Sequence, residues 1–128
     1  MGKNAPELVE VAAFLEAAEQ SGARDHALAC LLALNGLSAQ AACGATVEGL
    51  RRLADGTTTL AVSLTGGPPT PIPIAPRTAA AIDDHLDGRN AGPLLHADDG
   101  TPLQAPAAGL IVRRIVQAAG LDYRLGCF

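Results

Sequence analysis

The spacing of apolar residues predicts that most of this chain is helical. In residues 6–20 the apolar side chains of Leu8, Val11, Ala12 and Leu15 recur three or four residues apart, which places them on one stripe of a helix. The glutamates of the segment lie mostly off that stripe. Residues 6–20 are therefore predicted to form an amphipathic helix on the surface of the protein.

A second helix is predicted over residues 25–35, where nearly every side chain is apolar. Such a helix is buried on most sides. Asp25 is a suitable N-cap, and the Asn-Gly pair at the other end is a suitable stop. Further helical turns are predicted at 39–43 and at 47–53.

The centre of the chain changes to the two-residue period of β-strands. Residues 57–64 alternate larger apolar side chains with small or hydroxyl-bearing ones, which predicts a half-buried strand. Its inner face would carry Leu60, Val62 and Leu64. After a Gly-Gly turn, residues 70–74 read TPIPI, and both prolines remove an N–H donor from the same edge. This strand is therefore predicted to pair on one side only, at the edge of a sheet.

The last third of the chain returns to helices. Residues 78–86 are predicted to be helical with Thr78 as the cap, residues 94–96 are a candidate short strand, and residues 105–119 form the last helix. The inner stripe of the last helix would consist of Leu110, Ile111, Ile115 and Ala118. The whole pattern predicts an α+β fold that is mainly α-helical, with a small antiparallel sheet of two to three strands.

Size and composition agree with one domain, expected over 1–121 and followed by an irregular tail at 122–128. The 128 residues are 48% hydrophobic, which is enough to build a core. The net charge is -4, and aromatic residues make up only 2%. Because nucleic-acid affinity comes mainly from Lys and Arg, with aromatic residues stacking on bases, any DNA binding is expected to be weak.

The cysteines and the apolar runs bear on the location of the protein. Cys30, Cys43 and Cys127 are odd in number and form no CxxC pair, which argues against both disulfides and a zinc site. No signal-peptide pattern is present, and the longest apolar run, 27–34, is shorter than the roughly 20 residues that span a bilayer. We therefore expect a cytoplasmic protein with reduced thiols, no membrane contact and no cofactor.

Several short motifs follow one another in an order that resembles the first half of the catalytic domain of tyrosine recombinases, the phage integrase family. That family typically begins a buried helix with Arg-Asp-x-Ala-Leu, and this chain has RDHAL at 24–28. The helix typically ends in Thr-Gly-Leu-Arg with a glutamate three residues later, where this chain has NGLSAQA at 35–41. Further matches are VEGL at 47–50, TGG at 65–67, IPI at 72–74, GPLLHADDGTPL at 92–103 and RRIVQAAGL at 113–121. The resemblance covers nearly everything from Pro6 to Leu121 and implies a partial recombinase fold.

The resemblance also implies a chemistry. In the family a tyrosine attacks a DNA phosphodiester, two arginines stabilise the transition state and a lysine on a hairpin protonates the leaving oxygen. Here the first arginine position holds Ser38, its acidic partner position holds Ala41, and the lysine position holds Thr65. No His-x-x-Arg segment follows the last helix, and the only tyrosine, Tyr123, precedes the place where that segment would begin. The resemblance therefore implies a truncated, catalytically inactive relative in which these positions are vestigial.

Other side chains are candidates for binding. The candidate DNA contacts, if they share a face, are Arg51, Arg52, Arg77, Arg113 and Arg114. No metal site is expected. The acidic segment 83–88 loosely resembles a calcium loop but has Leu94 where that loop needs a glutamate. The spacing of His85, His96 and Asp98 matches no usable metal template.

Three functions remain open from the sequence. They are an inactive relic of DNA integration, a small protein-interaction or regulatory module that reuses the scaffold, and a domain that binds DNA weakly without cleaving it. The helix at 27–34 would lose part of its cover without the second half of the family's domain, and would then expose apolar surface. That predicts self-association, a helical protein partner on this face, or aggregation.

Overall fold

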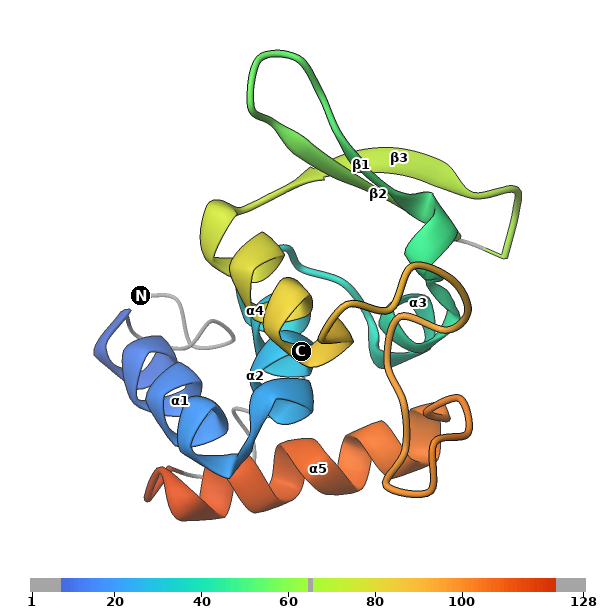
Figure 1. The fold of residues 1–128 in the computed structure, drawn as a ribbon. Helices are drawn as coiled ribbons and strands as arrows, with labels where there is room; N and C mark the ends of the chain where they lie inside the picture. Colours follow the sequence, from blue (N-terminus) through green and yellow to red (C-terminus); the bar gives the residue numbers. More distant parts are fainter. Residues whose placement is uncertain (1–7, 65, 122–128) are drawn as a thin grey trace.

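The computed structural model describes residues 8–64 and 66–121, and arranges the helices around a central one with a small sheet at one end (Figure 1). In chain order the elements are α1 (Leu8–Ser21), α2 (Ala23–Ala33), α3 (Ala39–Gly44), a 3-10 turn (Val47–Gly49), β1 (Leu50–Arg52), β2 (Thr58–Val62), β3 (Thr70–Ile74), α4 (Pro76–Leu86) and α5 (Ala105–Ala118). The predicted α+β, mainly helical class is confirmed. Thr65 and the tail at 122–128, with Tyr123, lie outside the described residues. Among the described helices, none combines the length and the apolar character needed to cross a membrane.

Helix α2 forms the centre of the core. Its residues from Ala27 to Leu32 are buried, as expected for a helix that is apolar on all sides. It packs against α1 and α4 and also contacts α3 and α5. The expectation that the stretch from Ala27 to Leu34 leaves an apolar face uncovered is therefore wrong. In that stretch only Leu34, the C-cap residue, is exposed, because α1, α4 and α5 already supply the cover.

Local sequence predicts where α2 ends but not where it begins. The helix begins after Gly22, whose φ of 141° is open mainly to glycine, so Asp25 is not the N-cap. Asp25 is instead buried in the first turn, where it accepts hydrogen bonds from Ser21 and Arg24. The predicted stop is confirmed, since Gly36 adopts a left-handed φ of 68° just beyond the helix.

The sheet is antiparallel in the order β1-β2-β3. Within the described part of the chain, strand β3 pairs only with β2, with Ile72 opposite Leu60, which confirms that the proline-containing segment is an edge strand. Leu60 and Val62 are buried as predicted. Leu64 is not: β2 ends at Val62, and the Leu64 side chain beyond it is 56% exposed.

Two predictions about short elements are wrong. Residues 47–53 form a single 3-10 turn followed by β1, because the free edge of β2 offers a pairing partner that favours an extended chain. Residues 94–96 do not form a strand, and the isolated bridges here are made by Pro93, just before the segment, and by His96. Leu94 and Leu95 are both fully buried, so the segment lacks the two-sided alternation of a surface strand.

Helix α4 begins two residues earlier than predicted, with Pro76 in its first turn. Thr78 is therefore not the cap. It is fully buried, and its hydroxyl donates to Oδ1 of Asn35, 2.7 Å away, which ties α4 to the end of α2.

The outer helices α1 and α5 bury slightly different faces from those predicted. In α1 the core residues are Phe14, Leu15 and Ala18, and Ala12 is exposed. In α5 the core residues are Ala108, Ile111, Val112, Ile115 and Val116. Leu110 and Ala118 are consequently exposed rather than inward-facing. Helix α1 packs against α2 and α5, whereas α5 packs against α1, α3 and α2, and these neighbours determine which stripe of each helix is buried.

Candidate functional site

A hollow of about 480 Å³ lies between α3 and the β2–β3 hairpin. The described residues that line it are Ser38, Gln40, Ala41, Gly44, Ser63, Leu64 and Gly66. Ser38 and Ala41, two of the positions where the motif resemblance implies catalytic groups, thus border one concave surface. The third position, Thr65, falls between two lining residues of the hairpin and lies outside the described residues.

Ser38 has a local structural role in this hollow. It is the N-cap of α3, with an extended backbone (φ -74°, ψ 161°), and its Oγ accepts a hydrogen bond from the N–H of Ala41 at 3.1 Å. The first N–H groups of a helix have no partner within the helix, and serine is among the residues that best supply one. The serine is therefore explained by the start of α3 without any catalytic role.

The described residues that line the hollow offer hydroxyl, amide and backbone groups but no charge. Ser63 donates its hydroxyl to the carbonyl of Gly67 at 2.7 Å, so this group too serves local structure. Such a surface can exchange neutral hydrogen bonds with a ligand. It provides no cation to stabilise a phosphoryl transition state and no cationic acid for a leaving group.

The arginines proposed as DNA contacts occupy different parts of the molecule. The pair at 51–52 is exposed on β1 at the sheet end, whereas the pair at 113–114 is exposed on α5 at the opposite end (Figure 1). Arg77 is exposed in the first turn of α4. Arg52 forms an ion pair with Asp83 of α4, which already satisfies part of its charge. The fold thus brings together neighbours within each pair but not all five arginines.

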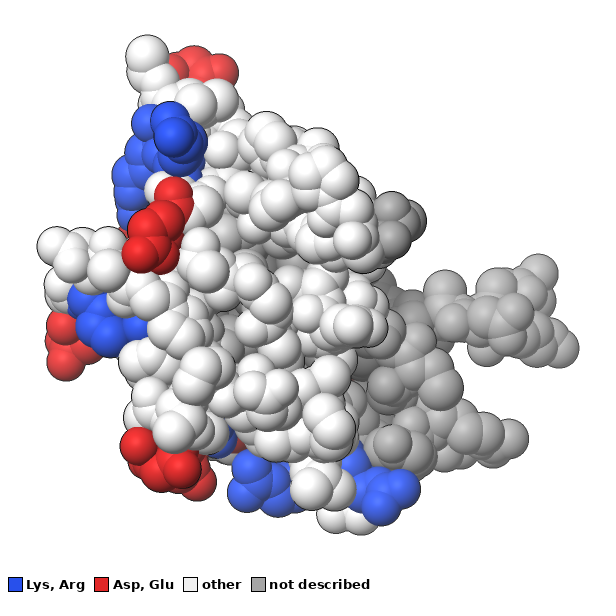
Figure 2. Space-filling view, turned by 90° about the vertical axis from the view of Figure 1, so that its right-hand side faces the viewer, with Lys and Arg blue, Asp and Glu red and all other residues white. Residues whose placement is uncertain are grey.

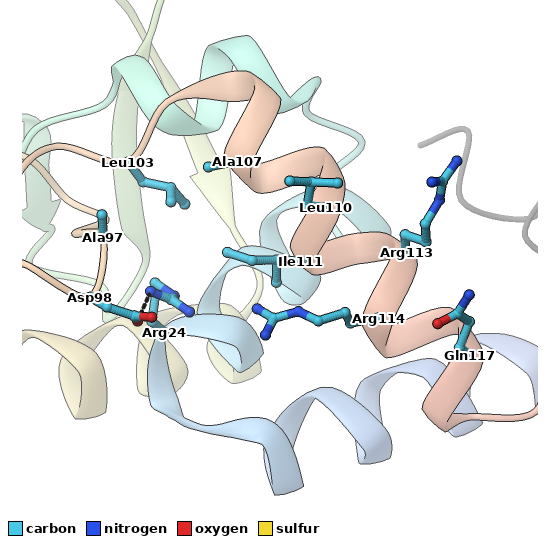
Figure 3. Close-up of a pocket in the computed structure, with 10 residues that line it drawn as sticks. All are labelled: Arg24, Ala97, Asp98, Leu103, Ala107, Leu110, Ile111, Arg113, Arg114 and Gln117. Carbon is cyan, nitrogen blue, oxygen red and sulfur yellow. Dashed lines mark hydrogen bonds and ion pairs between the residues drawn. The ribbon is translucent and has the colours of Figure 1, made fainter.

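A second hollow, of about 450 Å³, runs beside α5 and was not predicted from the sequence (Figure 3). Its apolar lining comes from Ala97, Leu103, Ala107, Leu110 and Ile111. Arg24 and Asp98 form an ion pair of 2.7 Å at one edge. Both Arg113 and Arg114 line the hollow, but the guanidinium group of Arg114 extends towards its apolar side chains and that of Arg113 is turned outwards (Figure 3). No sequence signal could have revealed this hollow, because Leu110 fits the inner stripe predicted for its helix and the rest of the lining includes residues far away in the chain.

Two of the three residues considered as metal ligands come together. The rings of His85 and His96 are nearly perpendicular, with centroids 6.3 Å apart, and Nε2 of His85 accepts from the backbone N–H of His96 at 3.3 Å. Asp98 pairs with Arg24 instead. Burial, reinforced by Arg89 and His96, lowers the pKa of His85 below its ordinary value. Across residues 8–64 and 66–121, no three His, Cys, Asp or Glu side chains are placed to hold a metal ion.

The fold is similar to that of a solved recombinase. No protein-family model and no curated protein sequence matches the chain. The crystal structure of XerA recombinase matches with a TM-score of 0.76 and 17% sequence identity, over 95% of this chain and 47% of that chain. The chain thus spans about half the length of that recombinase. The scaffold is recombinase-like, in agreement with the motif order, and at this identity the likeness concerns the fold alone.

Proposed function

We propose that this chain is a recombinase-like scaffold that does not cleave DNA. The observation that carries the proposal is the hollow between α3 and the hairpin, whose described lining residues bear no charge. Tyrosine-recombinase chemistry needs cationic groups around the reacting phosphate. Loss of one preorganised donor typically costs about 10²–10³ in rate, and here several would be missing together.

The neighbourhood of Ser38 supports the same conclusion. Its hydroxyl accepts the N–H of Ala41, so it is committed to the start of α3. A serine hydroxyl also lacks the charge and the two-pronged geometry with which arginine binds a phosphate. Ala41, at the position of the acidic partner, is buried and contributes only a methyl group.

The test is a nicked duplex DNA substrate that traps covalent protein–DNA adducts, analysed on a denaturing gel beside an active tyrosine recombinase. We expect no adduct with the purified chain. The matched control is Tyr123→Phe, which removes the only tyrosine. An adduct that forms with the chain and disappears in this variant would refute the proposal.

A second candidate function, a protein-interaction module, is favoured by a different observation. The surface around the hollow carries no charged side chain over a wide area (Figure 2). The cores of protein–protein interfaces are depleted of charge, whereas surfaces that bind nucleic acid are rich in Lys and Arg. On this reading the scaffold is retained for contact with another polypeptide.

A further inference from the structure

A pair of histidines links the connector between α4 and α5, residues 87–104, to the end of α4. His85 lies in the last turn of α4 and His96 near the middle of the connector, and both are half-buried. Nε2 of His85 accepts a hydrogen bond from the backbone N–H of His96 at 3.3 Å. Nε2 of His96 in turn lies 3.2 Å from Nη1 of Arg89. The two imidazoles therefore make two successive links that position this part of the connector.

Each link fixes the protonation state of the ring that takes part in it. A backbone N–H and a guanidinium can only donate hydrogen bonds, so the ring nitrogen opposite each of them must offer a lone pair. His85 and His96 are consequently neutral in this arrangement, with the ring proton on Nδ1. A proton added to either Nε2 would place two donors against each other and break the link.

The surroundings of the pair disfavour a positive charge on it. In the described structure the charged groups around the pair are Arg24 and Asp25 of α2 and Arg89 and Asp98 of the connector. Both carboxylates already form ion pairs with Arg24, at 2.9 and 2.7 Å. Burial, and after it the positive charge of Arg89, lowers the pKa of His85 below its ordinary value, although Asp25 acts in the opposite direction.

The part of the connector that depends on these links is residues 96–101, which we call the tip. Buried leucines on either side of the tip anchor the connector in the core, namely Leu94, Leu95 and Leu103. Apart from the histidine links, Arg24 holds the tip by donating to the carbonyl of His96 at 3.4 Å and to Asp98 at 2.7 Å. The Asp98 side chain is 95% exposed, so its ion pair is screened by water and weak. Loss of the imidazole links would therefore free the tip while the anchors keep the core closed.

We propose that the histidine pair is an acid-sensitive latch, which holds the tip at neutral pH and releases it when either ring takes up a proton. Ala97 and Asp98 of the tip line the hollow beside α5, so release changes one wall of that hollow (Figure 3). Mild acid thereby alters the shape of the hollow without unfolding the helices. The latch is independent of the loss of cleavage, because none of its residues lines the hollow between α3 and the hairpin.

The experiment is hydrogen exchange of the full chain, followed amide by amide with NMR at about pH 7.5 and about pH 5. Exchange is expressed as a protection factor relative to the unfolded chain at the same pH, which removes the intrinsic pH dependence of exchange. A released histidine titrates near pH 6.5 and a latched one at lower pH, so we expect the protection of the His96 amide to fall roughly tenfold in acid. Amides of α2 should lose no more protection than the change in global stability accounts for.

The informative variant is the double replacement His85→Gln and His96→Gln. A glutamine side chain offers an acceptor oxygen that does not titrate, so the amide of residue 96 should stay equally protected at both pH values. The matched control is His26→Gln, which replaces the remaining histidine of the chain, whose Nε2 has no hydrogen-bond partner among the described residues. It should leave the acid response of the tip unchanged. His85→Ala, which removes the acceptor, should lower the protection of the His96 amide already at neutral pH.

A second measurement uses the unaltered chain and tests the latch even if a variant fails to fold. Imidazole nitrogen shifts should show both His85 and His96 as Nδ1–H tautomers at neutral pH. An Nε2–H tautomer in His85 would contradict the hydrogen bond on which the latch depends. The latch is also refuted by equal protection of the tip at both pH values, or by an acid response that persists in the double variant. A loss of protection of the same size throughout α2 would overturn it as well, because this is global unfolding rather than release of the tip.

Discussion

Replacing Ser38 with alanine should destabilise the protein by about 1–2 kcal/mol, because the hydroxyl caps α3. Loss of an N-cap side chain costs about 0.5–2 kcal/mol in general. Two features of this helix favour the upper part of that range. Helix α3 has only six residues, and Ala41, whose N–H would lose its partner, is buried. Fraying of the first turn would therefore pull an apolar side chain out of the core, and a buried N–H left unpaired costs about 1–3 kcal/mol.

The assay is urea denaturation followed by circular dichroism, since the chain has no tryptophan for fluorescence. With a slope of about 2 kcal/mol/M, the midpoint should fall by roughly 0.5–1 M while the slope stays constant. Ser38→Thr and Ser38→Asp keep an acceptor oxygen and should stay close to the wild type.

The matched control is Gln104→Ala, at the N-cap of α5, where the side chain makes no capping bond. Its effect should lie within about 0.5 kcal/mol. The cap interpretation fails if Ser38→Ala leaves the midpoint unchanged, or if Ser38→Thr loses as much stability as Ser38→Ala.

Two other predictions concern pH and salt. The pKa of His85 is lowered by burial, so the unfolded chain takes up a proton near pH 6.5 while the folded chain does not. The free energy of unfolding should therefore fall as the pH drops through about 6.5 and level off below the lowered pKa. His85→Gln should reduce that dependence in denaturation curves, and the part that remains comes from His26, whose pKa burial also lowers. Duplex DNA binding should be weak, with a log–log salt slope no steeper than about -2, because the described arginine pairs at 51–52 and 113–114 lie at opposite ends of the molecule (Figure 1). Tight binding at physiological salt with a steeper slope would contradict the dispersed placement of the arginines.

Local sequence patterns correctly predicted the features that depend only on neighbouring residues in the chain. The edge position of β3 follows from two prolines that lack N–H donors, which holds whatever surrounds the strand. The burial of α2 follows from a segment that is apolar on every side. The order of short motifs indicated a recombinase-like fold, and the similarity to XerA recombinase agrees. Ser38 and Ala41, which were singled out by their places in those motifs, both line the hollow between α3 and the hairpin.

Several of the wrong predictions depend on a neighbour that lies elsewhere in the chain. Residues 47–53 become partly extended because β2 offers a pairing edge. Leu110 fits an inward stripe when the helix is considered alone, and is exposed because α1 and α3 contact the adjacent side of α5. The hollow beside α5 could not be predicted for the same reason, since its lining combines that helix with residues 97–103 and with Arg24.

The sequence by itself determined which chemical groups this protein possesses. It has a serine and an alanine where the motif resemblance implies charged groups, three long segments without charge, and a helix that is apolar on every side. Only the tertiary structure decided where these groups lie. It covered α2, separated the arginine pairs, and placed α3 between the hairpin and the start of α5, with a hollow on either side of it. Helix periodicity and missing N–H donors act over a few residues, whereas burial and the grouping of surface charge depend on which distant segments pack together.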